Sequence, residues 1–202
     1  MICILDYGSG NVGSVFNVLK FLGYDAKISN KDADLKNSTH LILPGVGAFN
    51  ASMEKIVNKI PMEILENEVI KNGKPFLGIC VGMQVLADLG VEGGNTKGFG
   101  WISGEVKRID SANQALPHMG WNNIEIKKDT PIFNNFKNIS DFYFVHSYAF
   151  FEKNEEHVLA KVEYGSEINA VINKDNIYGF QFHPEKSQRA GQLILKNFLS
   201  IQ

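Results

Sequence analysis

The sequence predicts an α/β protein with a mixed, largely parallel central sheet, flanking helices and an added antiparallel part. Apolar, strand-like runs alternate with helical patterns through about residue 90. From about residue 105 nearly every segment is strand-like, and a helical pattern returns only near the C-terminus. A chain of 202 residues with 44% hydrophobic content can bury one core, so we expect a single domain over 1–202.

The first half accounts for the parallel strands. The predicted strands and helices alternate, which implies right-handed crossovers between parallel neighbours. The helix near the N-terminus shows apolar residues at helical spacing, and the second helix is broken near Pro61. The predicted strands are 2–6, 26–28, 40–43 and 75–79, and the predicted helices are about 12–22, 50–72 and from Cys80 to about Leu89.

The second half accounts for the antiparallel part. Its segments are short, rich in β-branched and aromatic residues, and follow one another without intervening helices. The predicted strands are 105–109, 123–126, 142–145, 157–162, 170–172 and 178–182, followed by a helix at about 188–200.

Charge and cysteine usage exclude several classes of protein. Twenty basic against 22 acidic residues argue against a nucleic-acid binder, which usually carries a basic excess. Cys3 and Cys80 each lie in or at the end of a predicted strand, so we expect no disulfide framework and a reducing, cytoplasmic setting. The N-terminus lacks a basic leader, and no window approaches the roughly 20 apolar residues of a membrane span.

The segment Gly78-Ile79-Cys80-Val81-Gly82 has the form of a nucleophile elbow. Cys80 lies between a strand and a helix, with glycine two residues before and after it. Glycine relieves the crowding of a tight bend, and the positive end of the following helix favours a thiolate. The alternative is a buried structural cysteine in a parallel strand.

A cysteine nucleophile needs a base, and His183 is the strongest candidate of the five histidines. Glu185 follows two residues later, and side chains at i and i+2 of an extended segment face the same way. Pro184 biases His183 toward an extended backbone, and a carboxylate can orient the imidazole. His146 competes for this role but has no acidic neighbour in the sequence, while the alternative for His183 is a simple strand-end turn.

Acyl transfer also needs donors for the oxyanion. Pro44-Gly45-Val46-Gly47 follows a parallel strand, so it emerges at the same sheet edge as the elbow. An N–H of Val46 or Gly47, together with that of Val81, would form an oxyanion hole. The alternative is an ordinary strand-ending turn.

Residues 8–13 match the dinucleotide pattern G-x-G-x-x-G between a strand and a helix. The acidic partner expected about 20 positions later is represented only by Asp32, in a predicted polar loop. A dinucleotide-binding oxidoreductase is therefore a weak alternative to a glycine-rich turn shaped by packing.

Three segments together resemble the class I (triad) glutamine amidotransferases: 44–49, 78–84 and 181–187. The resemblance runs essentially end to end and implies a flavodoxin-like core, with no cofactor and no metal. It implies hydrolysis of L-glutamine to glutamate and ammonia through a thioester on Cys80, with His183 as base and acid and Glu185 orienting it.

The resemblance also implies contacts to the substrate. Gln84, one turn after Cys80, and Glu92 would hold glutamine, and the backbone of Ser147 and Tyr148 would contact its carboxylate. The segment 90–94 departs from the expected acidic run, which leaves a plain loop charge as the alternative for Glu92.

Segments 6–11, 117–122 and 143–148 narrow the resemblance to the glutaminase subunits of imidazole glycerol phosphate synthases. These subunits pass ammonia to a cyclase subunit, a (β/α)8 barrel, in histidine biosynthesis. We expect Asn11, Pro117, Met119 and Trp121 at or near that interface. Two alternatives are a paralogue that supplies a sugar amidotransferase in surface-polysaccharide biosynthesis and a non-catalytic binding module.

Overall fold

A computed structural model of the chain describes residues 1–137 and 141–201. A nine-stranded sheet crosses the molecule in the order β2-β1-β3-β4-β13-β12-β11-β8-β9. The strands from β2 to β13 are parallel, and those from β13 to β9 are antiparallel. A four-stranded sheet of order β10-β7-β5-β6 lies beside it. The predicted fold class is therefore confirmed.

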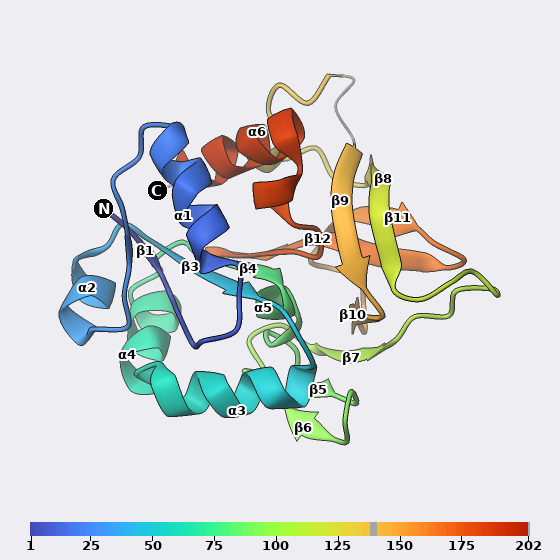
Figure 1. Cartoon of the computed structure of the whole chain (residues 1–202), viewed down its shortest axis with the longest axis horizontal. Helices are drawn as coiled ribbons and strands as arrows, with labels where there is room; N and C mark the ends of the chain where they lie inside the picture. The colour runs from blue at the N-terminus through green and yellow to red at the C-terminus, as the bar shows by residue number, and fades with distance from the viewer. Residues whose placement is uncertain (138–140, 202) are drawn as a thin grey trace.

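Figure 1 shows helices on both faces of the parallel part, with α1 and α6 on one side and α3 and α4 on the other. The strands of the large sheet are β1 (Ile2–Ile4), β2 (Ala26–Ile28), β3 (His40–Gly45), β4 (Phe76–Cys80), β8 (His118–Ile126), β9 (Asp141–His146), β11 (Val158–Glu163), β12 (Glu167–Lys174) and β13 (Ile177–Phe180). Those of the small sheet are β5 (Leu89–Gly90), β6 (Thr96–Lys97), β7 (Gly104–Arg108) and β10 (Tyr148–Glu152).

The helices cover the apolar strands with one buried side each. In α6, the buried residues Ala190, Ile194, Leu195 and Phe198 recur at helical spacing. The α-helices are α1 (Val12–Phe21), α2 (Asp32–Asn37), α3 (Phe49–Lys59), α4 (Met62–Glu66), α5 (Val81–Gln84) and α6 (Gln188–Leu199). Shorter turns are the π-helical η1 (Asn67–Lys71) and the 3₁₀ turns η2 (Pro131–Phe133) and η3 (Pro184–Lys186).

The predicted helix from Cys80 to Leu89 is wrong, because α5 ends at Gln84. The carbonyls of Val85 and Leu86 accept hydrogen bonds from Phe99 and Trp101, and Leu89 pairs with β7. These long-range hydrogen bonds replace those that would continue the helix. The helix dipole that acts on Cys80 is therefore that of a single helical turn.

Further elements differ from the prediction, among them the short strands β5 and β6, which were not predicted. The polar loop expected around Asp32 is the helix α2, β8 begins at His118 instead of 123, and β10 was not predicted. β10 follows β9 after one residue, Ser147, so the two strands read as one apolar run in the sequence. The strand predicted at 105–109 pairs in the small sheet.

The register of the parallel strands places the predicted functional segments together. Gly45 at the end of β3 pairs with Cys80 at the end of β4, and Ile79 pairs with Phe180 at the end of β13. The carboxyl ends of β3, β4 and β13 therefore meet at one edge of the sheet, which is where ligands bind in open α/β folds.

Both glycines of the elbow are required by close backbone packing. A Cβ at Gly82 would lie 1.8 Å from the carbonyl oxygen of Leu43, and one at Gly78 would lie 2.2 Å from the carbonyl oxygen of Gly82. Backbone atoms cannot move aside as a flexible side chain can, so only glycine allows β3, β4 and α5 to pack this closely.

We expect Gly82→Ala to destabilise the fold by about 3 kcal/mol, because it overpacks the sheet edge. Denaturant unfolding monitored by circular dichroism measures this change. Gly13→Ala is the matched control: its Cβ meets nothing within 4 Å in an exposed helical turn, so its stability should stay within about 1 kcal/mol of wild type. Equal stability of the two variants would contradict the packing explanation.

Candidate active site

Cys80 lies in a strained turn between β4 and α5. Its backbone has φ 55° and ψ −110°, a conformation that residues other than glycine rarely adopt. Its side chain is 3% exposed. The turn directs the sulfur away from the sheet edge into a pocket, as expected for a nucleophile elbow.

His183 and Glu185 come from the turn that follows β13. His183 Nδ1 lies 2.8 Å from Glu185 Oε1, and both side chains are 1% exposed. Ser187 Oγ donates to the His183 carbonyl at 2.6 Å and accepts from the Tyr143 N–H at 3.0 Å. The turn is thus tied to β9, which fixes the imidazole in place.

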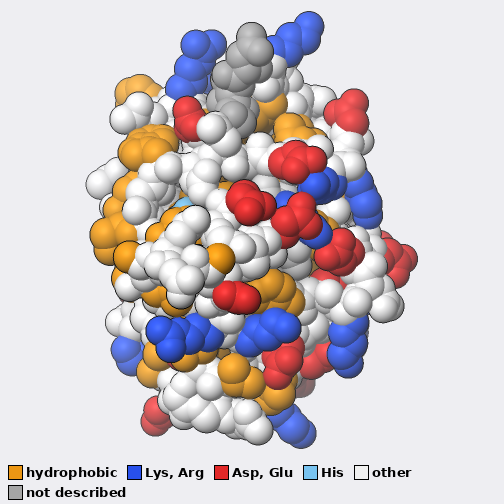
Figure 2. Space-filling model, turned by 90° about the vertical axis from the view of Figure 1, so that its right-hand side faces the viewer, with side chains coloured by type: hydrophobic (Ala, Val, Ile, Leu, Met, Phe, Trp, Pro, Cys, Tyr) orange, Lys and Arg blue, Asp and Glu red, His pale blue; other side chains and the backbone are white. Residues whose placement is uncertain are grey.

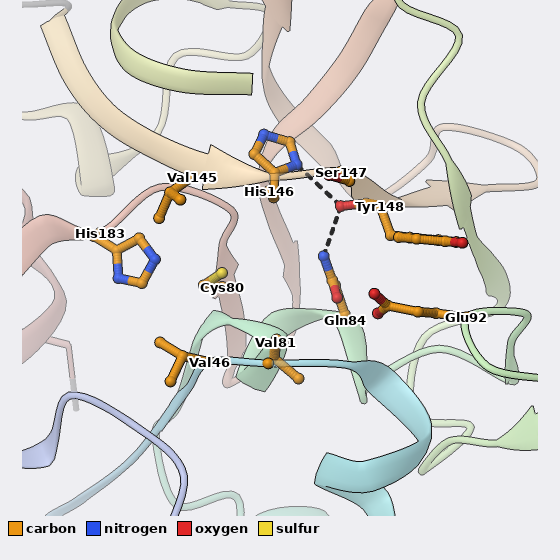
Figure 3. A pocket seen from close by; sticks show the side chains of 11 residues that line it. Val46, Cys80, Val81, Gln84, Glu92, Val145, His146, Ser147, Tyr148 and His183 are labelled. Atoms are coloured by element: carbon orange, nitrogen blue, oxygen red, sulfur yellow. Dashed lines mark hydrogen bonds between the residues drawn. The ribbon is translucent and has the colours of Figure 1, made fainter. Parts of the chain in front are cut away.

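The other ring nitrogen of His183 is available to Cys80. Nε2 is buried and has no hydrogen-bond partner among the described residues. Figure 3 shows the ring facing the Cys80 sulfur across the pocket. Burial alone would lower the pKa of His183, but a Cys80 thiolate and the Glu185 carboxylate outweigh it and raise the pKa to about 10. The surroundings of the ring therefore favour its charged form.

Asn11 reaches the same carboxylate. Its Nδ2 donates to Glu185 Oε1 at 3.1 Å, and its Oδ1 accepts from Ser14 Oγ at 2.7 Å. The residue that we predicted at a partner interface therefore also orients the third member of the triad. Glu185 Oε1 has two donors, whereas its Oε2 is buried and has no hydrogen-bond partner within residues 1–137 and 141–201.

A pocket of about 290 Å³ opens beside Cys80. The pocket is lined by Cys80, by His183 and by all the residues predicted for the oxyanion hole and for substrate contacts (Figure 3). Those residues are Val46, Gly47, Val81, Gln84, Glu92, Ser147 and Tyr148. Glu185 lies behind His183 and does not line the pocket.

Two of these side chains are held in place by hydrogen bonds to other residues of the protein. Gln84 Nε2 donates to the Tyr148 carbonyl at 2.8 Å and to Gln181 Oε1 at 3.1 Å. Glu92 Oε2 accepts from the Phe49 N–H at 2.9 Å, which caps the start of α3 and draws the carboxylate to the pocket. Glu92 is therefore not a free loop charge.

His146 does not have the surroundings of a catalytic base. Its Nδ1 lies 3.0 Å from the Tyr148 carbonyl and its Nε2 lies 3.1 Å from His118 Nδ1, so both nitrogens are occupied. Burial lowers the pKa of His146 to about 3, which keeps the ring neutral. This leaves His183 as the candidate base.

The glycines of residues 8–13 serve packing. A Cβ at Gly10 would lie 2.7 Å from the Pro44 carbonyl oxygen, so Gly10 lets the first loop approach the predicted oxyanion loop. Nothing lies within 4 Å of a Cβ at Gly13, whereas the third glycine of a dinucleotide fingerprint is needed for close helix–strand packing. The pattern is thus a turn, in agreement with its missing acidic partner.

The remaining predicted interface residues lie on or next to β8. Met119 is 61% exposed and Trp121 is 49% exposed, and Pro117 is also exposed. Trp121 meets the ring of Tyr143 edge to face, with centroids 6.1 Å apart, and Lys186 Nζ lies 5.5 Å from that ring centroid. This apolar patch therefore adjoins the turn that carries His183 and Glu185.

Sequence reasoning missed three contributors to the site. Gln181 is fully buried and its Nε2 lies 3.8 Å from Cys80 Sγ. Asn11 binds Glu185, and His118 binds His146. Gln181 and His118 lie within segments 181–187 and 117–122, which carry the family resemblance. Their alternation with core residues along strands was the sequence signal that could have identified them. Nothing local in the sequence links Asn11 to a residue 174 positions away.

Among residues 1–137 and 141–201, no group of three or more His, Cys, Asp or Glu side chains could hold a metal ion. Over the same ranges, no helix combines the length and apolar character that crossing a membrane requires.

Comparisons with known proteins agree with this geometry. The family model "Glutamine amidotransferase class-I" matches residues 3–201. The imidazole glycerol phosphate synthase subunit HisH of Caldanaerobacter subterraneus subsp. tengcongensis is 48% identical, over 98% of this chain and 97% of that protein. The HisH subunit of Pelagibacter ubique is 44% identical, over 99% of each chain.

Solved structures show the same fold at low identity. A structure described as a glutamine amidotransferase superposes with a TM-score of 0.74 at 19% identity, covering 98% of this chain and 97% of the other. PurLQS from Thermotoga maritima gives a TM-score of 0.72 at 18% identity, with coverage of 98% and 97%.

We expect iodoacetamide at neutral pH to modify Cys80 and not Cys3. Cys3 is fully buried, and burial raises its pKa to about 11, so it carries almost no reactive thiolate. Peptide mass spectrometry locates the adduct, and Cys3→Ser should be labelled as the wild type is. Labelling confined to Cys3 would contradict the assignment of Cys80 as the reactive thiol.

We expect the contribution of His183 to stability to fall between pH 6.5 and 10. Its pKa rises from 6.5 to about 10 on folding, so the stabilisation is complete below pH 6.5 and is lost as pH rises through the folded value. Urea unfolding of wild type and His183→Gln at several pH values measures this. A stability difference that stays constant across that range would show that the imidazolium is not stabilised by the fold.

Proposed function

Because this chain belongs to the class-I glutamine amidotransferases, we propose that it hydrolyses L-glutamine to glutamate and ammonia through a thioester on Cys80. The observation that carries the proposal is that Cys80 and His183 line one pocket and that Glu185 holds the imidazole from behind. A thiol, an imidazole and a carboxylate in this order form the nucleophile, base and orienting group of acyl transfer.

The first half of the reaction forms the thioester. His183 Nε2 takes the proton of the Cys80 thiol, and the thiolate attacks the side-chain amide carbon of glutamine. The tetrahedral intermediate places its negative oxygen toward the N–H groups of Val81 and of Val46 or Gly47. The intermediate collapses as the C–N bond breaks, and the His183 imidazolium donates its proton to the leaving nitrogen, which departs as ammonia.

The second half restores the enzyme. His183, again neutral, takes a proton from water as the water oxygen attacks the thioester carbonyl. The C–S bond breaks, glutamate is released, and the proton returns to the sulfur–imidazole pair. Glu185 keeps Nδ1 of the ring protonated throughout, so Nε2 is the nitrogen that exchanges protons.

Specificity for glutamine follows from the rest of the pocket. The Glu92 carboxylate would attract the substrate ammonium group, and the backbone at Ser147 and Tyr148 would receive its carboxylate. Gln84 uses both hydrogens of its amide within the protein, so it offers its oxygen to the ligand as an acceptor.

We propose that the ammonia passes to a cyclase subunit of (β/α)8-barrel type, which makes imidazole glycerol phosphate in histidine biosynthesis. The relatives named as HisH subunits of that synthase support this choice. The exposed patch at Met119 and Trp121, next to the catalytic turn, supports a partner surface close to the site. A closed interface keeps ammonia neutral, since in water near pH 7 it is mostly protonated.

The end of the molecule at the right of Figure 1 carries charged side chains of both signs on its surface. Figure 2 shows acidic and basic side chains interspersed over this face. Lys161 in β11 and Lys127, which directly follows β8, both pair with Glu167 in β12, and Lys161 also pairs with Glu155. Exposed ion pairs of this kind each contribute little to the stability of the fold.

Deletion of the gene for this chain in its host should cause histidine auxotrophy, and a wild-type copy should restore growth without histidine. Cys80→Ala should restore growth only with high ammonium, because the partner could then use free ammonia. A surface-polysaccharide paralogue would give no auxotrophy on deletion. Full rescue by Cys80→Ala at low ammonium would contradict the thioester mechanism.

A further inference from the structure

A continuous line of hydrogen bonds runs from β8 to the pocket. Asn122 Nδ2 donates to His118 Nε2 at 3.2 Å, and His118 Nδ1 lies 3.1 Å from His146 Nε2. His146 Nδ1 lies 3.0 Å from the Tyr148 carbonyl oxygen, which also accepts from Gln84 Nε2 at 2.8 Å. Figure 3 shows the last two bonds meeting at Tyr148.

The partners permit one arrangement of protons when both rings are neutral. A carbonyl only accepts, so His146 carries its proton on Nδ1 and its Nε2 must accept from His118 Nδ1–H. His118 Nε2 then accepts from Asn122, whose own Oδ1 accepts from the Asn123 N–H at 2.8 Å. Each ring is therefore fixed in the Nδ1–H tautomer by the group that follows it.

The surroundings keep both rings neutral. His118 is 3% exposed and His146 is 6% exposed. The rings of Phe144 and Tyr164 stack on His118, with centroids 4.8 and 4.1 Å away. Burial lowers the pKa of His118 to about 4 and that of His146 to about 3, and the nearby His183 further disfavours a cation at His146. A proton added to either ring would turn two N–H groups toward each other.

The pocket end of the line leads to the nucleophile. Gln84 donates its second amide hydrogen to Gln181 Oε1 at 3.1 Å, and Gln181 Nε2 lies 3.8 Å from Cys80 Sγ. The Tyr148 carbonyl is thus the junction between the two histidines and the amide that faces the ligand. If it moved, the Gln84 amide could rotate and present a donor instead of an acceptor.

We propose that His118 and His146 are positioning residues for the reaction at Cys80: a neutral pair, each ring protonated on Nδ1, holds the Tyr148 carbonyl and thereby orients the Gln84 amide. This inference rests on the proposed function, since it concerns how the pocket recognises glutamine. Neither histidine exchanges a proton with the substrate.

The test compares two electrophiles on the full chain. His118→Phe keeps an aromatic ring between Phe144 and Tyr164 but removes the donor to His146. We expect modification of Cys80 by a glutamine-analogue chloromethyl ketone to slow about 10- to 100-fold, because the analogue must be oriented in the pocket. Modification by iodoacetamide, which needs only the thiolate, should be unchanged.

Two substitutions of His146 distinguish a positioning role from a role in packing. His146→Leu removes the donor to Tyr148, whereas His146→Asn supplies an amide donor near the position of Nδ1. We expect the asparagine variant to recover much of the rate lost in the leucine variant. His40→Phe is the control: this buried histidine packs edge to face on Phe198 at the start of β3, far along the strand from the pocket.

Nitrogen-15 NMR of the imidazoles tests the tautomers in the wild-type chain without any variant. We expect both His118 and His146 to show a protonated Nδ1 and an unprotonated Nε2 at neutral pH. A protonated Nε2 on His146, or a His118→Phe chain that reacts with the analogue at the wild-type rate, would overturn the inference. Failure of the analogue to label wild-type Cys80 selectively would instead overturn the proposed function, and the NMR result would remain independent of it.

Discussion

The close approach of three backbone segments at one edge of the sheet is the constraint on which the site depends. The Leu43 carbonyl lies where a Cβ of Gly82 would be, and the Gly82 carbonyl lies where a Cβ of Gly78 would be. This packing forces the chain to turn sharply at Cys80 and to adopt φ 55° there. The sulfur therefore leaves the sheet at a fixed angle.

Parallel pairing brings the rest of the triad to that sulfur. Because Phe180 pairs with Ile79, the turn after β13 begins beside the turn after β4, and His183 needs only three more residues to reach the pocket. Distant segments then hold it: Ser187 ties the turn to β9, and Asn11 brings the loop after β1 to Glu185. The carboxylate and the thiolate together keep a buried imidazole charged, against the effect of its burial.

Much of this could be predicted from the sequence, because local patterns encode it. The elbow glycines, the spacing of His183 and Glu185, and the strand–helix alternation are all local signals that the structure places together. The length of α5 could not be predicted, since its end is set by hydrogen bonds from residues 99–102 to the carbonyls of residues 85–87. The contacts of Asn11, His118 and Gln181 were missed for the same reason, because each joins segments far apart in the chain. The roles of Val46, Gly47, Glu92 and Ser147 in binding stay predictions, although the structure gathers these residues in one pocket.

We infer that the Cys80 sulfur and the His183 imidazole act together on a glutamine-like ligand in one pocket. A crystal structure of the chain after reaction with the glutamine-analogue ketone tests it most directly. We expect continuous density from Cys80 Sγ to the analogue, His183 Nε2 within hydrogen-bond distance of the reacting atoms, and the analogue's ammonium group against Glu92. An adduct on another residue, or a His183 ring turned away from the sulfur with Glu185 still bound to it, would contradict the mechanism.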